Sequence, residues 1–247
     1  VSPVVVCQDV TVYLDASGVA VISANDIDNG SLDNCGIADL ALDNTSFTCS
    51  DLGIEAVTLT ATDSSGNTNS CSANVTVLDT AAPQAICQNV TVYLDGTGNA
   101  IIDALDADGG STDNCEVASR SLSVTSFDCS SLGANSTTLT ITDPSGNSNT
   151  CPAIVTVLDT TPPAITCPIV PAQCGDNVSG GIVTFTLPTA TDNCSATVTQ
   201  VDATSLNSGS IFPTGTTTLT YEAEDADGNM ATCSFDVVVL PQPEAGF

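Results

Sequence analysis

The sequence predicts an all-β protein of three tandem immunoglobulin-like β-sandwich domains, stapled by disulfides and joined end to end. Three observations lead to this fold: an 80-residue repeat, a strand-like alternation of apolar and polar residues, and twelve cysteines. Self-similarity at a fixed period indicates repeated structural units. Four cysteines of the first repeat return 80 positions later: Cys7, Cys35, Cys49 and Cys71 recur as Cys87, Cys115, Cys129 and Cys151.

Repeat boundaries follow from these cysteines and from the prolines between them. The first repeat is expected at 1–80, the second at 81–160 and a more divergent third at 161–241, with 242–247 starting a linker to a further domain. A proline follows each boundary, as at Pro83, and stiffens the short linker there.

Within each repeat, apolar and polar residues alternate with period two, as they do in half-buried strands. Val10, Val12 and Leu14 share one face, whereas Thr11 and Tyr13 share the other. Thr and Val favour strands, and Asp, Asn, Gly and Ser form the turns between them. Six or seven short strands in about 80 residues are typical of an immunoglobulin-like sandwich. So small a domain has a marginal core, and two disulfides in each repeat are the expected remedy.

The twelve cysteines are expected to form disulfides rather than a zinc site. The chain has no histidine, and no two cysteines stand in the C-x₂₋₄-C spacing of Cys₄ zinc sites. Disulfides persist in oxidising compartments, so the protein is expected outside the cytoplasm, at the cell surface or secreted. No signal peptide opens the chain and no apolar stretch approaches the ~20 residues of a membrane span, so we expect no membrane insertion and an exported fragment of a longer precursor.

Comparison of the repeats predicts which cysteines pair. Three positions occur in all repeats: the first-strand cysteine, the Asp-Asn-Cys cysteine and the last-strand cysteine. The fourth varies, being Cys49 and Cys129 in the first two repeats and Cys174 in the third, so it should partner one constant cysteine. The first and last strands of such a sandwich can lie side by side in parallel, which would pair their cysteines. The predicted bonds are Cys7–Cys71, Cys35–Cys49, Cys87–Cys151, Cys115–Cys129, Cys167–Cys233 and Cys174–Cys194.

Acidic residues dominate the charge. With 29 Asp and Glu against one basic residue, Arg120, the formal net charge is −28. Such a chain repels nucleic acids and anionic membrane surfaces, so neither is an expected partner. The acidity has two interpretations of equal weight: solubility of an exposed protein, or a surface that binds divalent cations. Arg120 itself is expected to form a surface ion pair.

No catalytic or cofactor-binding residues are predicted, so we expect a protein that is not an enzyme. Without histidine, the Ser-His-Asp and Cys-His arrangements are excluded, and no phosphate-binding glycine loop opens a helix. Paired carboxylates hydrolyse glycosides, but sugar sites normally use aromatic platforms. This chain has three Tyr, six Phe and no Trp.

An Asp-x-x-Gly-Asn motif that occurs in every repeat has two interpretations. As structure it is a hairpin turn, in which Gly takes the positive φ that other residues resist; as function, its Asp is a calcium ligand. In a sandwich of this topology the motif shares one end with the Asp-Asn-Cys segment and with the incoming linker. Three carboxylates would then meet at each junction and could hold Ca²⁺: Asp79, Asp113 and Asp143 at the first, and Asp159, Asp192 and Asp225 at the second.

Residues 161–240 resemble the hyalin (HYR) repeat and related immunoglobulin-like modules of extracellular proteins. The resemblance is carried by Thr-Pro-Pro-Ala-Ile-Thr-Cys-Pro at 161–168, Ala-Thr-Asp-Asn-Cys-Ser at 190–195 and the segment at 212–221. The first two repeats are looser relatives, with Asp-Asn-Cys and Asp-x-x-Gly-Asn retained. Tandem, Asp- and Thr-rich, Lys-poor arrays are similar to the long surface adhesins of Bacteroidota. That likeness implies export by type IX secretion, contact with the gliding machinery, and O-glycosylation of the linker threonines Thr80 and Thr160.

Structural spacer repeats, which form the stalk of a surface adhesin, are therefore the expected function. Two alternatives remain open at this point. The repeats could themselves bind an extracellular surface ligand or neighbouring copies, or they could be accessory modules of a secreted multidomain enzyme. The rest of the precursor would discriminate between them, because many further copies indicate an adhesin and a neighbouring hydrolase indicates an accessory module.

Overall fold

The computed structural model describes residues 1–176 and 180–242. The chain divides into two compact units, each built from discontinuous segments. One unit holds the first repeat and part of the second, and the other holds the remainder of the second repeat and the third. Unit 1 comprises 1–88, 103–124 and 137–153, and unit 2 comprises 89–102, 125–136 and the described part of 154–247.

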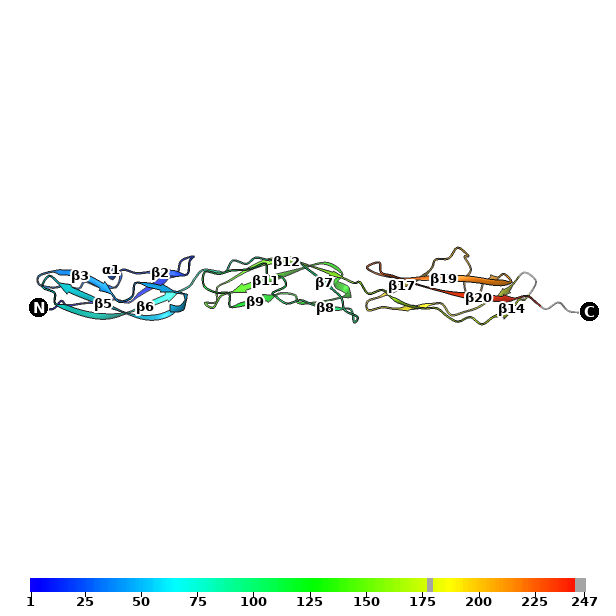
Figure 1. The fold of residues 1–247 in the computed structure, drawn as a ribbon, viewed down its shortest axis with the longest axis horizontal. Helices are drawn as coiled ribbons and strands as arrows, with labels where there is room; N and C mark the ends of the chain where they lie inside the picture. Colours follow the sequence, from blue (N-terminus) through cyan, green and yellow to red (C-terminus); the bar gives the residue numbers. More distant parts are fainter. Residues whose placement is uncertain (177–179, 243–247) are drawn as a thin grey trace, which may run out of the picture. The chain divides into compact units, whose positions relative to one another are not determined.

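The first repeat, in unit 1, is a β-sandwich with two short helical turns. Its elements are β1 (Val10–Tyr13), β2 (Val19–Val21), α1 (Ala24–Ile27), β3 (Ile37–Leu42), β4 (Ser46–Thr48), the 3₁₀ turn η1 (Cys49–Asp51), β5 (Gly53–Asp63) and β6 (Thr68–Leu78). One sheet has the order β1-β6-β5-β3, of which β3, β5 and β6 are labelled in Figure 1. β2 pairs with β4 in a second, smaller sheet. β1 runs parallel to β6, as predicted for the first and last strands. The four-residue α1 is far too short to cross a membrane, and no other helix among the described residues is long and apolar enough.

Side chains from both sheets form the core of this repeat. Phe47 of β4 and Ile27 of α1 are fully buried and belong to one cluster with Leu59 of β5 and Val75 of β6. Along β5 and β6 the inward positions are apolar, apart from the buried Asp63 at the end of β5, and the outward positions are mostly threonine, serine and asparagine. The period-two pattern of the sequence therefore specifies which face of each strand is buried.

The second repeat has the same strand order. Its elements are β7 (Val90–Tyr93), β8 (Asn99–Ile101), β9 (Ser119–Leu122), β10 (Ser126–Asp128), the 3₁₀ turn η2 (Cys129–Ser131), β11 (Gly133–Thr142) and β12 (Ser148–Leu158). The larger sheet is ordered β7-β12-β11-β9. In unit 1, β9 lies antiparallel to the end of β11. In unit 2, β7 lies parallel to the end of β12, and β8 pairs with β10.

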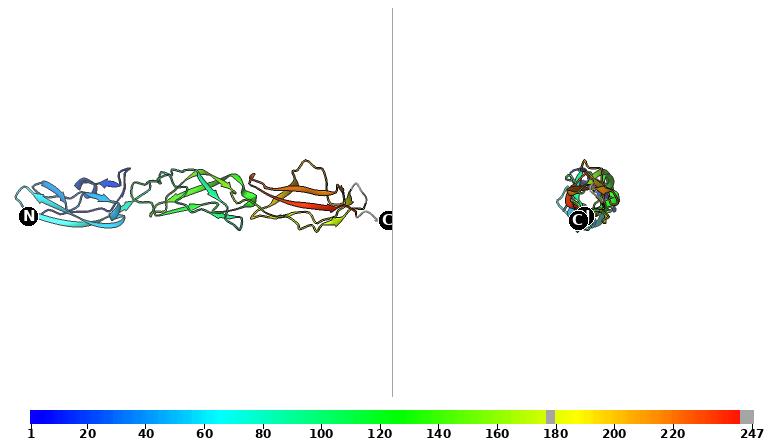
Figure 2. Two further views of the ribbon diagram at one scale, coloured as in Figure 1. Left: turned by 45° about the vertical axis from the view of Figure 1, so that its right-hand side comes forward. Right: turned by 90° about the vertical axis from the view of Figure 1, so that its right-hand side faces the viewer.

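The third repeat, in unit 2, keeps the four-stranded sheet and varies the rest. Its elements are β13 (Ala164–Thr166), β14 (Gln173–Cys174), β15 (Gly181–Ile182), β16 (Thr189–Thr191), β17 (Ala196–Gln200), β18 (Ile211–Phe212), β19 (Gly215–Asp225) and β20 (Met230–Leu240). The sheet order is β14-β20-β19-β17, with two small sheets, β13-β16 and β15-β18. The long β19–β20 hairpin is visible in orange and red in Figure 2. These sheets confirm the predicted all-β, immunoglobulin-like fold; residues 243–247 of the expected linker lie outside the described residues.

Three disulfides join the first-strand and last-strand cysteines within repeats, in the pairs that the sequence predicts. They are Cys7–Cys71, Cys87–Cys151 and Cys167–Cys233, with Cα atoms 5.8–5.9 Å apart. In the first repeat the parallel pairing of β1 with β6 explains the bond, because Cys7 and Cys71 stand just before Val10 and Val75, which lie opposite each other.

The other three predicted bonds, Cys35–Cys49, Cys115–Cys129 and Cys174–Cys194, are wrong. Cys49 bonds to Cys115 and Cys129 bonds to Cys194, while Cys35 and Cys174 are exposed and unbonded.

The length of the strands explains why these predicted bonds do not form. Cys35 lies beside the end of β5 at Asp63, because β3 starts opposite that residue, whereas Cys49 lies beside its start at Gly53. Eleven strand residues at about 3.3 Å each separate the two cysteines by roughly 30 Å, and a disulfide needs Cα atoms within about 7 Å. β19 separates Cys174, opposite Leu240, from Cys194 in the same way.

Candidate functional site

The first junction, in unit 1, is closed by a disulfide that crosses from one repeat to the next. Cys49 follows β4 in the first repeat, Cys115 belongs to the Asp-Asn-Cys segment of the second, and their Cα atoms are 5.5 Å apart. Gly18 lies against this bond with a φ of +74°. A Cβ added there would stand 2.7 Å from the carbonyl oxygen of Asn114 and 2.8 Å from Cys49 Sγ. Only a residue without a Cβ permits this close approach.

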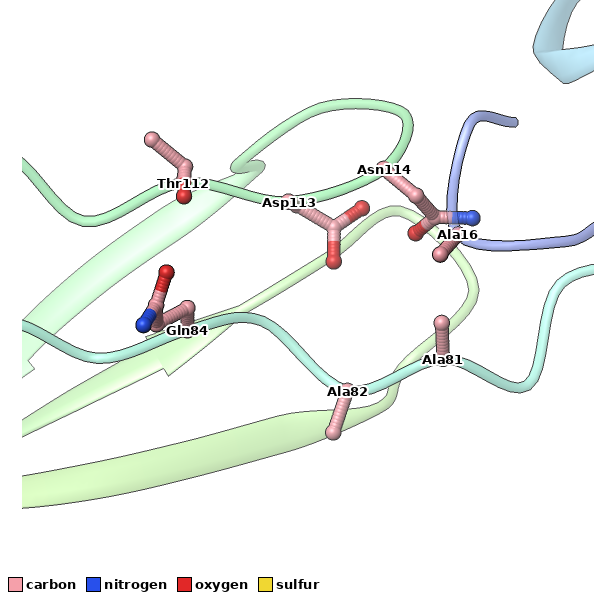
Figure 3. A pocket seen from close by; sticks show the side chains of 7 residues that line it. All are labelled: Ala16, Ala81, Ala82, Gln84, Thr112, Asp113 and Asn114. Atoms are coloured by element: carbon pink, nitrogen blue, oxygen red, sulfur yellow. The ribbon is translucent and has the colours of Figure 1, made fainter.

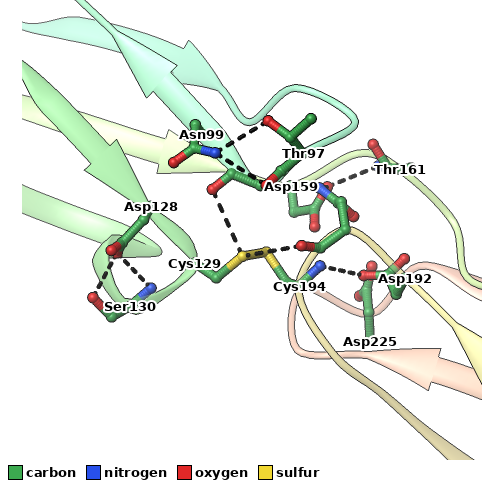
Figure 4. The surroundings of a disulfide bond; sticks show 12 residues. Thr97, Asn99, Asp128, Cys129, Ser130, Asp159, Thr161, Asp192, Cys194 and Asp225 are labelled. Atoms are coloured by element: carbon green, nitrogen blue, oxygen red, sulfur yellow. Dashed lines mark hydrogen bonds between the residues drawn. A yellow bond between two sulfur atoms is a disulfide. The ribbon is translucent and has the colours of Figure 1, made fainter.

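The second junction, in unit 2, repeats this arrangement. Cys129 bonds to Cys194 with Cα atoms 5.4 Å apart (Figure 4). Gly98 takes the place of Gly18. A Cβ on Gly98 would stand 2.6 Å from the carbonyl oxygen of Asn193. The two junctions therefore share one arrangement, a disulfide between successive repeats with a glycine packed against it.

An asparagine side chain fastens each junction further. Asn114 Nδ2 donates to the carbonyl oxygen of Asp15 in the first repeat and to Asp79 Oδ1 in the linker, both at 3.2 Å. Asn193 Nδ2 makes the equivalent bonds to Asp95, at 3.1 Å, and to Asp159 Oδ1, at 3.2 Å. One amide thus links a repeat, the linker and the following repeat.

The Asp-x-x-Gly-Asn motif forms a hairpin turn that also holds the linker. At the first junction Asn147 Nδ2 donates to Asp143 Oδ2, at 2.8 Å, and to the carbonyl oxygen of Asp79, at 3.1 Å. The glycine takes a positive φ, +89° at Gly146, as the turn interpretation requires. The side chain of Asp143 is buried.

In the second junction Asn229 makes the same pair of bonds, to Asp225 and to the carbonyl oxygen of Asp159. Burial raises the pKa of Asp225, but hydrogen bonds from Asn229 and Asp227 outweigh it, and the pKa lies below its usual value. The carboxyl group is therefore ionised at neutral pH.

The structure brings most of the predicted carboxylates together. At the second junction Asp159, Asp192 and Asp225 each offer an oxygen, and these atoms lie within 4.8 Å of one another. At the first junction Asp79 and Asp113 meet in the same way, beside the bonded sulfur of Cys115. Asp143 does not join that group, although Asn147 holds its carboxylate in the same way that Asn229 holds the carboxylate of Asp225.

A shallow pocket of about 320 Å³ lies beside the first junction (Figure 3). The side chain of Asn114 points toward the turn of the first repeat at Ala16, and Asp113 points toward the linker at Ala82. The linker, the turn and the Asp-Asn-Cys segment therefore face one space.

The predicted calcium ligands were all aspartates and did not include the asparagines, although each asparagine stands inside one of the motifs described above. Asn114 and Asn193 are the middle residues of Asp-Asn-Cys, and Asn147 and Asn229 end the Asp-x-x-Gly-Asn motifs. Their recurrence at matching positions was the available signal.

The remaining candidate residues lie apart from the carboxylate clusters. Arg120 Nε donates to Asp108 Oδ2 at 2.6 Å, with the arginine side chain 29% exposed, so the predicted ion pair is present. Thr80 and Thr160 are exposed beside the buried Asp79 and Asp159. Their glycosylation stays a prediction, which the intact mass of native material would test.

The strand order and the disulfides define a repeat protein of disulfide-linked, immunoglobulin-like β-sandwiches. Residues 158–239 match the model of the HYR domain. The chain is 34% identical over 197 residues to "Hyalin" of Lytechinus variegatus, covering 74% of this chain and 36% of that protein. It is 33% identical over 194 residues to "Hyalin" of Strongylocentrotus purpuratus, covering 74% of this chain and 16% of that protein. This chain thus spans about a third of the first relative and a sixth of the second.

These matches support a protein of HYR and immunoglobulin-like repeats, and together with the disulfides they indicate an extracellular location. They point to structural or adhesion modules rather than to an enzyme. Among solved structures, the "I-band fragment I67-I69 from titin" matches with a TM-score of 0.40 and 14% identity, over 98% of this chain and 99% of that one.

Proposed function

We propose that this chain supplies spacer repeats to an extracellular adhesion-type protein, which hold other parts of that protein at a distance from the surface. The observation that carries the proposal is the disulfide that crosses each junction, Cys49–Cys115 and Cys129–Cys194. The HYR match and the hyalin relatives support the same class of role.

A spacer must resist bending and separation where its modules meet. A backbone linker alone rotates about its φ and ψ angles, whereas a second covalent connection, packed against Gly18, removes most of that freedom. The disulfides within repeats, Cys7–Cys71 and Cys87–Cys151, do not connect the two sides of residues 72–86. Of the disulfides, Cys49–Cys115 alone therefore bridges the first linker.

Cleavage in the linker tests the proposal directly. Thr80→Lys places a trypsin site in the exposed linker, and Arg120 supplies the one site already present. Under non-reducing conditions, with enough urea to open the sites, we expect the cleaved chain to keep its full mass plus the added water. The Cys49–Cys115 bond keeps the fragments on either side of the cut at residue 80 together, and the Cys87–Cys151 bond keeps those on either side of the cut at Arg120 together. Reduction should then release three fragments.

The matched control carries Thr80→Lys together with Cys49→Ser and Cys115→Ser. It should release residues 1–80 without reduction, while the cut at Arg120 stays bridged. If Thr80→Lys alone releases residues 1–80 from the oxidised chain, the repeats are joined by a single flexible linker and the spacer proposal fails.

It stays a prediction that this chain belongs to a gliding adhesin of Bacteroidota and is exported by type IX secretion. That prediction rests on sequence resemblance. The parent protein would test it, since the proposal expects many further repeats of this kind and the secretion signal of that pathway.

A further inference from the structure

We propose that each junction binds a Ca²⁺ ion, through side-chain oxygens of three residues that recur at matching positions. The ligands are Asp79, Asp113 and Asn114 at the first junction, and Asp159, Asp192 and Asn193 at the second. This inference goes beyond the spacer role and does not depend on it.

Unpaired buried oxygens are the first observation. In the part of the chain that the structure describes, six buried side-chain oxygen or nitrogen atoms have no hydrogen-bond partner, and all six are oxygens of these residues. Asp79 and Asp159 are only 5% and 4% exposed. A buried oxygen without a hydrogen-bond partner is unfavourable whether it belongs to a carboxylate or to an amide, so six such atoms at two equivalent positions require a common explanation. The atoms are Asp79 Oδ2, Asp113 Oδ1, Asn114 Oδ1, Asp159 Oδ2, Asp192 Oδ2 and Asn193 Oδ1.

The orientation of the amides is the second observation. Asn114 Nδ2 donates to the carbonyl oxygen of Asp15 and to Asp79 Oδ1, so its Oδ1 is the atom that stays unpaired. Turning the amide over would place its oxygen against two other oxygens. The hydrogen-bond network therefore leaves an acceptor, not a donor, beside the carboxylates.

Protein groups do not neutralise the clustered carboxylates. Arg120, the one basic side chain of the sequence, is paired with Asp108. At the second junction the three carboxylates each place an oxygen within 4.8 Å of the others, a separation at which like charges repel one another strongly unless a cation lies between them.

The chemistry of the ligand atoms favours Ca²⁺ over other divalent ions. These atoms are carboxylate and amide oxygens, which Ca²⁺ takes in an irregular shell of six to eight, completed by waters and carbonyls. Zn²⁺ prefers histidine and thiolate ligands, but the chain has no histidine, and Cys115 and Cys194 are held in disulfides. Mg²⁺ requires a stricter octahedron and keeps more of its water.

The two junctions should differ in affinity. At the second, Asp225 adds a third carboxylate to the group, whereas at the first Asp143 stays outside it. More negative charge around the ion raises calcium affinity. We therefore infer that the second junction fills first.

Calorimetric titration of the oxidised full chain with CaCl₂ tests the proposal, after removal of metals by chelation and in about 0.15 M NaCl to screen the diffuse surface charge. We expect two ions per chain, the tighter one at the second junction, and a rise in melting temperature with Ca²⁺. Asp192→Asn should remove the tighter event and Asp113→Asn the weaker, while MgCl₂ at equal concentration gives a smaller shift in melting temperature.

The matched control is Asp33→Asn, which changes the same motif position in the first repeat, where no cluster of this kind is formed. It should leave two binding events. Absence of both heat and melting shift, or an unchanged stoichiometry in Asp113→Asn and Asp192→Asn, would overturn the proposal and attribute any binding to surface charge. Folding of the variants is checked in chelator, where loss of a carboxylate should leave the melting temperature equal or higher.

Discussion

The sulfur of Cys49 is bonded to Cys115, 66 positions further along the chain, and not to the nearer Cys35. This bond joins the trailing end of one sandwich to the leading end of the next. Because it encloses parts of two repeats, its loss should affect both of them and not only one domain.

Removal of the first junction disulfide, by Cys49→Ser with Cys115→Ser, should destabilise unit 1. Chain-entropy arguments for a loop of 66 residues give about 4 kcal/mol. Urea unfolding followed by far-UV circular dichroism measures the change. Cys35→Ser, at an unbonded position, is the control and should shift the midpoint little. Equal midpoints for the double variant and the wild type would contradict the junction role of this bond.

Gly18→Ala should destabilise the protein more than Gly66→Ala does. Both glycines have positive φ, +74° and +83°, so each substitution carries a backbone cost of about 1–2 kcal/mol. A Cβ at Gly66 meets open space, but at Gly18 it would meet the Asn114 carbonyl at 2.7 Å. That clash should add about 1–3 kcal/mol. Paired urea melts give the difference, and identical costs would mean that the close approach is absent in solution.

Two thiols per oxidised chain should react with a maleimide without any reductant. Cys35 and Cys174 are exposed and unbonded, whereas the other ten cysteines are bonded in pairs. Intact mass measures the number of labels, and Cys35→Ser should lower it from two to one. An unlabelled oxidised chain would show a sixth disulfide and refute the assignment.

Asp108 should contribute stability that disappears in acid. Burial raises the pKa of Asp108, but hydrogen bonds from Ser111 and the Arg120 side chain outweigh it and hold the pKa at about 2, against an ordinary value of 3.8. A carboxyl group with a lowered pKa stabilises the fold fully above pH 3.8, and that contribution is lost as the pH falls through about 2.

Urea midpoints measured from pH 2 to 7 check this expectation, with Asp108→Asn compared against the wild type. The variant should lose stability less steeply between about pH 4 and 2. Parallel curves for the two proteins over that interval would contradict it.

Much of the fold follows from the sequence because its pattern is local and repeated. Alternation at Val57, Leu59 and Ala61 fixed the buried face of β5, and the matched openings of the first and last strands predicted the Cys7–Cys71 bond. These features depend on residues a few positions apart or on one strand pairing.

The junction disulfides were not predictable in the same way. With an 80-residue period, a bond from Cys49 back to Cys35 and a bond from Cys49 forward to Cys115 both fit the repeat pattern. The length of β5, which the spacing of the cysteines does not reveal, distinguishes between the two. One signal was present: the third repeat keeps Cys194 but lacks a cysteine at the position of Cys49 and Cys129. The carboxylate clusters were anticipated, but the asparagines beside them depend on side-chain contacts that spacing does not reveal.

The junction bond has a direction along the chain. Cys49 and Cys129 each bond to a cysteine of the following repeat, whereas Cys115 and Cys194 each bond to a cysteine of the preceding repeat. A head-to-tail contact of this kind joins two different surfaces, unlike the symmetric interface of a two-fold dimer, which joins two identical ones. Duplication of a repeat like the second, which carries both Cys115 and Cys129, would therefore add one backward and one forward cysteine together. An array of such repeats can lengthen or shorten by entire units during evolution without creating a further unmatched thiol.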